Sequence, residues 1–235
     1  MNTNNYTLRQ KLLAGSVHLF TSSGIVAGFM AMLAIMAYHW QEAAIWLIVC
    51  QIIDGVDGTL ARRFRIKEVL PDWNGKNIDY VVDFCTYALI PALFMYQADL
   101  FPQNLDICAA AAVLLTSAMY YGKEGMVSSD NYFIGFPVLW NAVAVYLVFV
   151  WHWSPAVNFI FVLCLCVLHF IPIKFPYPSQ MSSFRRLTIA CLCLMALALM
   201  AIIALYPDRN YLLEILATVT AIYFFAISVW VTYKK

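Results

Sequence analysis

Eight long apolar runs dominate the sequence and limit what the chain can fold into. Hydrophobic residues make up 63% of the 235 residues, and charged residues only 11%. A soluble domain usually carries about 25% charged residues, whereas a transmembrane helix needs about 20 mostly apolar residues in a row. The runs are continuous rather than alternating, which argues against a β-barrel. The sequence therefore predicts an all-α integral membrane protein.

Polar or proline-rich segments divide the sequence into about eight expected transmembrane helices. They cover approximately residues 17–39, 43–64, 77–98, 105–121, 135–152, 155–172, 187–206 and 211–233. With eight spans both termini lie on one side of the membrane, and every Lys and Arg except Arg209 falls on that side. Because positive charge marks the cytoplasmic side, we expect both termini in the cytoplasm. The chain is then a single polytopic domain over residues 1–235.

The first residues add a further apolar pattern. Leu8, Leu12 and Leu13 precede the first expected span, which predicts a short N-terminal helix lying in the membrane interface. The alternative is that the same leucines simply begin the first span.

Two pairs of aspartates interrupt the second and third spans at the same cytoplasmic depth. Asp54 and Asp57 follow the apolar stretch 43–53, and Asp79 and Asp83 stand in "GKNIDYVVDF". Residues three or four apart share one face of a helix. Two neighbouring antiparallel helices therefore bring four carboxylates to one level.

Four carboxylates in this setting call for a cation. Each costs on the order of 2.5–3.5 kcal/mol near the centre of a bilayer, and together they repel one another. Carboxylate oxygens suit Mg²⁺ and Mn²⁺, and the spacings can bracket two ions about 3.5–4 Å apart. We therefore predict a site for two divalent metal ions. The alternative is a set of water-exposed loop acids.

Small and basic residues beside the aspartates indicate a phosphorylated ligand. Gly58 and Ala61 lie on the helical face of Asp54 and leave room for a ligand against the backbone. Arg62 suits phosphate oxygens, and Gly75 begins the next helix, where free backbone N–H groups favour anions. Together they predict a pyrophosphate group bound beside the metal ions.

These residues resemble the signature of the CDP-alcohol phosphotransferase family, D-x-x-D-G-x-x-A-R…G-x-x-x-D-x-x-x-D, over residues 54–83. The resemblance implies a polytopic, usually dimeric enzyme whose active site opens to the cytoplasm. Such an enzyme moves a phosphatidyl group from a CDP-linked lipid to an alcohol and releases CMP. For a bacterial chain this implies the inner membrane.

The resemblance also implies a role for each matching residue. Asp54, Asp57, Asp79 and Asp83 would bind the two metal ions, and Asp83 would also be the general base that takes the proton of the incoming hydroxyl. Gly58, Ala61, Arg62 and Gly75 would contact the CDP group.

Three features resemble the bacterial phosphatidylcholine synthases within this family. The segment 63–74 is longer than is usual in the family, the expected spans are more numerous, and the stretch "DNYFIGFPVLWN" covers 130–141. This implies CDP-diacylglycerol as donor and choline as acceptor. Serine is the alternative acceptor, as in a phosphatidylserine synthase, and its carboxylate would need a basic partner such as Lys123, Lys174, Arg185 or Arg186.

The expected cytoplasmic segment around residues 130–141 carries candidate acceptor residues. A quaternary ammonium group binds aromatic faces, and the segment offers Asn131, Tyr132, Phe136 and Trp140. The alternative is an aromatic belt at the membrane interface.

Two other classes of function compete with a transferase. A divalent-cation transporter would need acids along a path to the opposite side, and Arg62 would oppose the passage of cations. A structural membrane scaffold leaves the aspartates unexplained.

Overall fold

The computed structural model describes residues 6–177 and 184–234. Lys235, one of the basic residues used above to orient the chain, lies outside the described residues. The chain separates into two compact units, Met1–Leu93 and Phe94–Lys235. Each unit has its own helices.

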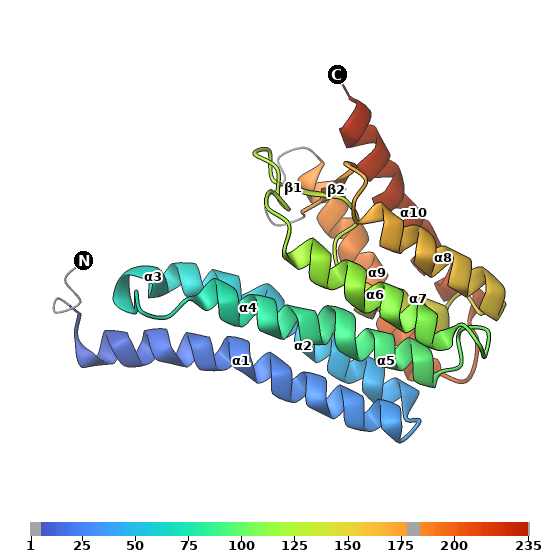
Figure 1. Ribbon diagram of the computed structural model, residues 1–235, viewed down its shortest axis with the longest axis horizontal. Helices are drawn as coiled ribbons and strands as arrows, with labels where there is room; N and C mark the ends of the chain where they lie inside the picture. Colours follow the sequence, from blue (N-terminus) through green and yellow to red (C-terminus); the bar gives the residue numbers. More distant parts are fainter. Residues whose placement is uncertain (1–5, 178–183, 235) are drawn as a thin grey trace. The chain divides into compact units, whose positions relative to one another are not determined.

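From residue 6 onward, the first unit consists of three helical rods that lie side by side (Figure 1). Its elements are α1 (Leu8–Met36), α2 (Trp40–Arg63), the short α3 (Ile66–Val69), α4 (Gly75–Asp83), the π-helix η2 (Phe84–Leu89) and α5 (Ile90–Gln97), which runs on into the second unit. The last three follow one another without a break and form the third rod. The helix α2 ends just before α3, and α4 begins shortly after it. The aspartates of α2 and α4 therefore lie toward the α3 end of the unit.

The start of α1 corrects one prediction. Thr7 caps the helix, because its side chain accepts a hydrogen bond from the Gln10 backbone N–H, while the Gln10 side-chain oxygen accepts one from the Thr7 backbone N–H. From Leu8 to Met36 the helix is continuous. A separate N-terminal interfacial helix is therefore wrong, and Leu8 and Leu12 form the first turn and a half of α1.

Two glycines of α1 allow the third rod to approach closely. A Cβ atom at Gly24 would lie 2.8 Å from Val82 Cγ1, and one at Gly28 would lie 2.7 Å from Ile90 Cδ1. Small residues at this spacing let helix backbones pack at short distance in membranes. This contact fixes α4 against α1.

Among its described residues, the second unit holds five helices of its own and a small sheet. Its elements are α6 (Asp106–Tyr121), β1 (Tyr132–Ile134), α7 (Trp140–Phe149), α8 (Pro155–Leu168), β2 (Lys174–Pro176), α9 (Arg185–Leu205) and α10 (Tyr211–Tyr233). β1 and β2 pair antiparallel, with Phe133 opposite Phe175. The all-α prediction therefore needs a correction: both strands lie in segments expected to be loops, where aromatic residues and prolines favour extended backbone over helix.

Each of the eight expected spans overlaps a helical segment, but the segments differ in length. Within the described residues, five are long and apolar enough to cross a membrane: Leu8–Met36, Trp40–Arg63, Gly75–Gln97, Arg185–Leu205 and Tyr211–Tyr233. The helices α6, α7 and α8 have 16, 10 and 14 residues, or about 24, 15 and 21 Å at 1.5 Å per residue. The chain is a membrane protein whose described part contains five candidate spans and three shorter apolar helices.

Candidate active site

The aspartates of α2 and α4 converge at one place in the first unit. Each of Asp54, Asp57 and Asp79 offers a carboxylate oxygen, and these oxygens all lie within 4.8 Å of one another. Asp83 is the last residue of α4, and its carboxyl group lies within hydrogen-bonding reach of Asp54. The two helices therefore bring together the four side chains that the sequence predicts to meet.

This arrangement fits divalent metal ions. Oxygens on opposite sides of one Mg²⁺ lie about 4.2 Å apart, twice the metal–oxygen distance of about 2.1 Å, so small side-chain rotations would suffice to bind an ion. Carboxylates alone suit Mg²⁺ or Mn²⁺ better than a soft metal. Asp57 is buried, and a cation would offset the repulsion that burial of several carboxylates otherwise strengthens.

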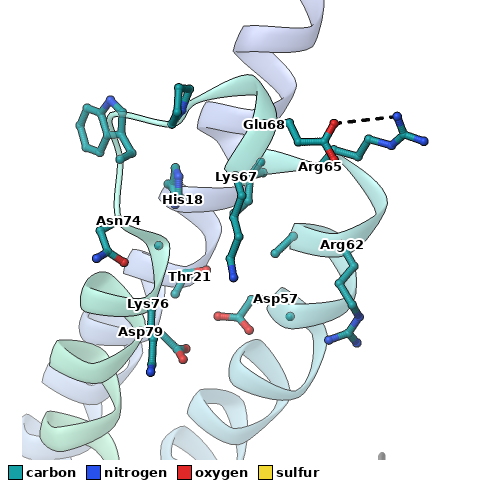
Figure 2. A pocket seen from close by; sticks show the side chains of 16 residues that line it. His18, Thr21, Asp57, Arg62, Arg65, Lys67, Glu68, Asn74, Lys76 and Asp79 are labelled. Carbon is teal, nitrogen blue, oxygen red and sulfur yellow. Dashed lines mark ion pairs between the residues drawn. The ribbon is translucent and has the colours of Figure 1, made fainter. Parts of the chain in front are cut away.

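A cavity of about 630 Å³ opens beside the aspartates, and Asp57 and Asp79 form part of its wall. Figure 2 shows Asp57 on α2 facing Asp79 on α4 across the cavity. The four residues expected to contact the CDP group all line it as well: Gly58, Ala61, Arg62 and Gly75. Six of the eight signature residues thus line one cavity.

The two glycines of this surface meet different neighbours. At Gly58 an added Cβ would lie 3.5 Å from Arg62 Nη1, an ordinary contact. At Gly75 it would lie 2.9 Å from His18 Cε1, which is too close. Gly75 therefore makes room for His18 of α1, in addition to opening the N-terminus of α4.

Further basic residues surround the cavity. Arg62, Arg65, Lys67 and Lys76 all line it, and the Lys67 side chain points into it toward Asp57 (Figure 2). Arg62 is steadied by a hydrogen bond of 3.2 Å from its Nη2 to Thr59 Oγ1. This density of positive charge suits an anionic ligand that bridges the space above the aspartates.

The helix α3 holds Lys67 in place. Ile66 and Val69 of α3 pack with Ala14 and Val17 of α1 in one buried cluster. Arg65 adopts a left-handed conformation with φ of 48° and turns the chain from α2 into α3. The extra length of segment 63–74 thus forms a wall of the cavity.

Comparison with known proteins assigns the family. Residues 18–171 match the CDP-alcohol phosphatidyltransferase family, a range that contains the four aspartates and the glycines beside them. The chain belongs to this family.

Relatives of this CDP-alcohol phosphatidyltransferase share most of its length. A protein of Pseudomonas aeruginosa named phosphatidylcholine synthase is 36% identical over 220 residues, which are 94% of this chain and 92% of the relative. Proteins with the same name from Bradyrhizobium diazoefficiens and Borreliella burgdorferi are 38% and 31% identical, over 82% and 95% of this chain and 70% and 96% of their own lengths.

Sequence reasoning missed three side chains of this transferase site. Thr21 lies beside the Asp57 carboxylate, and Tyr87 donates a hydrogen bond of 2.7 Å to Asp54 Oδ2. His18 lines the cavity and stacks on Trp73 with ring centroids 6.0 Å apart. The positions of Thr21 and His18 on α1 do not predict a role in the site, because the sequence of α1 alone does not show which helices pack against it.

The predicted acceptor residues lie in the second unit and are mostly packed. Trp140 is fully buried, and its Nε1 donates to Ser117 Oγ at 2.8 Å. The ring of Phe136 contacts Trp140, His169 and Phe175. A choline ammonium would have to displace one of these neighbours to reach either ring.

The ends of this segment are more polar. Asn131 is exposed with a left-handed φ of 63°, whereas Tyr132 of β1 is buried. Lys174 Nζ donates to Asp130 Oδ2 at 2.6 Å, and this ion pair lowers the pKa of Asp130. Lys174, a candidate partner for a serine carboxylate, is therefore already paired with a protein carboxylate.

Proposed function

We propose that this chain is a phosphatidylcholine synthase, which transfers the phosphatidyl group of CDP-diacylglycerol to choline and releases CMP. The observation that carries the proposal is the site itself: the family signature lines one basic cavity beside converging aspartates. The names of relatives that cover most of the chain support choline as the acceptor.

The cavity binds the CDP group of the donor. Its volume of about 630 Å³ falls in the usual range of about 300–1,000 Å³ for small-molecule sites. Gly58 and Ala61 let the nucleotide approach the backbone of α2, and Gly75 opens the N-terminus of α4. Arg62 and Lys67 neutralise the pyrophosphate.

The four aspartates would hold two Mg²⁺ or Mn²⁺ ions, which would supply Lewis-acid polarisation of the phosphoryl group. Asp83, at the end of α4, accepts the proton of the choline hydroxyl. The hydroxyl oxygen forms a bond to the phosphorus that carries diacylglycerol, and the bond from this phosphorus to the CMP oxygen breaks. Because the Asp83 carboxyl group lies next to Asp54, the base is close to the phosphorus that reacts.

The enzyme acts in the bacterial inner membrane. Its chain crosses the membrane eight times as one polytopic domain, with both termini and the active site on the cytoplasmic side, where the basic residues gather. The shorter α6, α7 and α8 then cross where the local hydrocarbon layer is thinner or water enters. The functional form is a homodimer, as is usual in the family.

Choline binds near the segment 130–141, with Asn131 and Tyr132 as the foremost contacts. Phe136 and Trp140 then pack behind this segment without contacting choline, since their rings already contact other aromatic side chains. Serine is the competing acceptor.

The test is an acceptor assay on purified full-length protein. With CDP-diacylglycerol, choline and Mn²⁺ or Mg²⁺, we expect release of CMP and formation of phosphatidylcholine. Asp83→Asn should abolish turnover without changing thermal unfolding, and Asp99→Asn, an aspartate in the second unit, is the matched control. Faster turnover with serine than with choline would refute the acceptor but keep the reaction class, whereas full activity after chelation of divalent ions would refute the metal site.

A further inference from the structure

Tyr87 contacts the aspartate cluster from outside the family signature. Its hydroxyl donates a hydrogen bond of 2.7 Å to Asp54 Oδ2, and only 6% of the residue is exposed. It lies in η2, the π-helical turn that begins directly after Asp83. A π-helical turn inside a helix is rare and often marks a functional site.

The π-helical turn is held from two sides. Thr86 faces α1, where a Cβ atom at Gly28 would lie 3.2 Å from its Cγ2, and its hydroxyl donates to the Val82 carbonyl at 3.0 Å. The next residue, Tyr87, faces Asp54 of α2. Packing of Thr86 against α1 and the hydrogen bond of Tyr87 to α2 together restrict the movement of the phenol away from the Asp54 carboxylate.

We propose that Tyr87 is a positioning residue, which orients the Asp54 carboxylate for binding a divalent metal ion. The hydrogen bond to Oδ2 fixes the plane of the carboxylate and reduces the rotamer freedom that metal binding would otherwise have to remove. Side chains that hydrogen-bond to metal ligands usually change metal affinity by about 10–100-fold when they are removed. The inference rests on the metal site of the proposed function.

A second role for Tyr87 has to be separated from this one. A buried tyrosine hydroxyl needs an acceptor for its own sake, and Asp54 could be that acceptor with no effect on metal binding. Tyr146 in the second unit offers the matched case, because its hydroxyl is also buried and donates to the Ala217 carbonyl at 2.8 Å. Both Tyr→Phe substitutions remove one buried hydroxyl, but only Tyr87 contacts the aspartate cluster.

The experiment measures Mn²⁺ binding to the full-length protein in detergent by the electron paramagnetic resonance signal of free Mn²⁺. We expect Tyr87→Phe to raise the dissociation constant about 10–100-fold and Tyr146→Phe to leave it unchanged. The Mn²⁺ concentration that gives half-maximal activity, measured in isolated membranes, should rise by the same factor. That measurement needs no purification, so it serves even if Tyr87→Phe is poorly extracted.

The outcomes distinguish the positioning role of Tyr87 from the existence of the metal site. If wild-type protein binds Mn²⁺ and Tyr87→Phe binds it equally well, the positioning role is overturned while the metal site stands. If the wild-type protein binds no Mn²⁺ at all, the proposed metal site fails, and the role of Tyr87 fails with it.

Discussion

The two units of this chain use polar and aromatic side chains in opposite ways. In the first unit, charged groups such as Asp57, Arg62 and Lys67 line a cavity of about 630 Å³. In the second, the polar atoms of Trp140 and Tyr146 are buried against Ser117 and a backbone carbonyl. The first unit thus holds charged groups around an open cavity, whereas the second buries the polar atoms of these two aromatic side chains against internal hydrogen-bond acceptors.

This contrast predicts how variants should divide. Substitutions around the cavity should change the KM for CDP-diacylglycerol and leave unfolding largely unchanged. Substitutions among the packed aromatic residues should lower the free energy of unfolding and leave the KM for CDP-diacylglycerol and the KM for choline unchanged. Four variants test this division.

Gly58→Ala should have the largest effect, on donor binding. The added methyl lies only 3.5 Å from Arg62 Nη1, so the free protein tolerates it, and alanine favours a helix by about 1 kcal/mol over glycine. A nucleotide lying against α2 would meet the methyl group. Overpacking of about 1–3 kcal/mol corresponds to a rise in the KM for CDP-diacylglycerol of about 5–150-fold, which steady-state kinetics measures.

Gly55→Ala is the control for this variant. It lies three residues earlier in α2, does not line the cavity, and an added Cβ there meets nothing within 4 Å. It should have normal kinetics and equal or greater stability. Equal KM values for the two alanine variants would show that the donor does not approach α2 at Gly58.

Trp140→Phe should have the next largest effect, on stability. The substitution leaves the buried hydroxyl of Ser117 without its donor at 2.8 Å, and an unsatisfied buried polar group costs about 1–3 kcal/mol. We expect a lower unfolding temperature in detergent and an unchanged KM for choline. Trp153→Phe is the control, because Trp153 is 38% exposed and should be less sensitive.

The opposite result for Trp140→Phe would break the comparison. A severalfold rise in the KM for choline with unchanged unfolding would place Trp140 in the acceptor site, as the sequence predicts. The second unit would then also expose part of its aromatic cluster during the reaction.

These variants also mark where sequence reasoning succeeds and fails. The helical spacing of Asp54, Asp57, Asp79 and Asp83 predicts that they share faces and meet, and the structure brings them together, because the relevant periodicity is local. Trp140 carries no such local signal: an aromatic residue in a lipid belt, a binding site or a core has the same neighbours in sequence. Contacts with residues distant in sequence, such as Ser117 at 23 positions and His169 at 29 positions, identify the packed state.

The same reason explains what was missed in the first unit. Segment 63–74 is visibly long, but its fold as a cavity wall depends on Ala14 and Val17 of α1. Tyr87 reaches Asp54 across 33 positions. Contacts between distant segments decide both cases, and no pattern within one segment encodes them.

Lys67→Met should have a smaller effect than Gly58→Ala. Methionine keeps the length and apolar stem of the side chain and removes the ammonium group that points toward Asp57 (Figure 2). An exposed charge contact contributes up to about 1 kcal/mol, so the KM for CDP-diacylglycerol should rise about fivefold, and less at high salt. The comparison of inhibition by CDP and by cytidine gives a second measurement, because only CDP should lose affinity.

Arg63→Gln is the control for Lys67→Met. Arg63 is exposed, ends α2, and does not line the cavity, so its loss removes one positive charge near the site but not in it. If both variants raise the KM equally, long-range attraction of the anionic donor explains the effect, and Lys67 makes no specific contact.

The smallest expected effect belongs to Asp130, at the polar end of the second unit. The hydrogen bond from Lys174 at 2.6 Å lowers the pKa of Asp130. The ionised form of Asp130 is therefore more stable in the folded protein than in the unfolded chain. The resulting stability is present above the ordinary pKa of about 3.9 and is lost as the pH falls through the lower pKa of the folded state. Because both side chains are partly exposed, the contribution is at most about 1 kcal/mol.

The measurement compares thermal unfolding of wild-type protein and Asp130→Asn at several pH values and salt concentrations. The wild-type advantage should be present at pH 7 and should disappear toward pH 3 and at high salt. If Asp130→Asn instead changes the KM for choline at pH 7 with no change in unfolding, the ion pair serves the acceptor rather than the hairpin of β1 and β2. Asp130 would then belong with Asn131 and Tyr132 to the proposed choline contacts, and the polar end of the second unit would serve binding rather than packing.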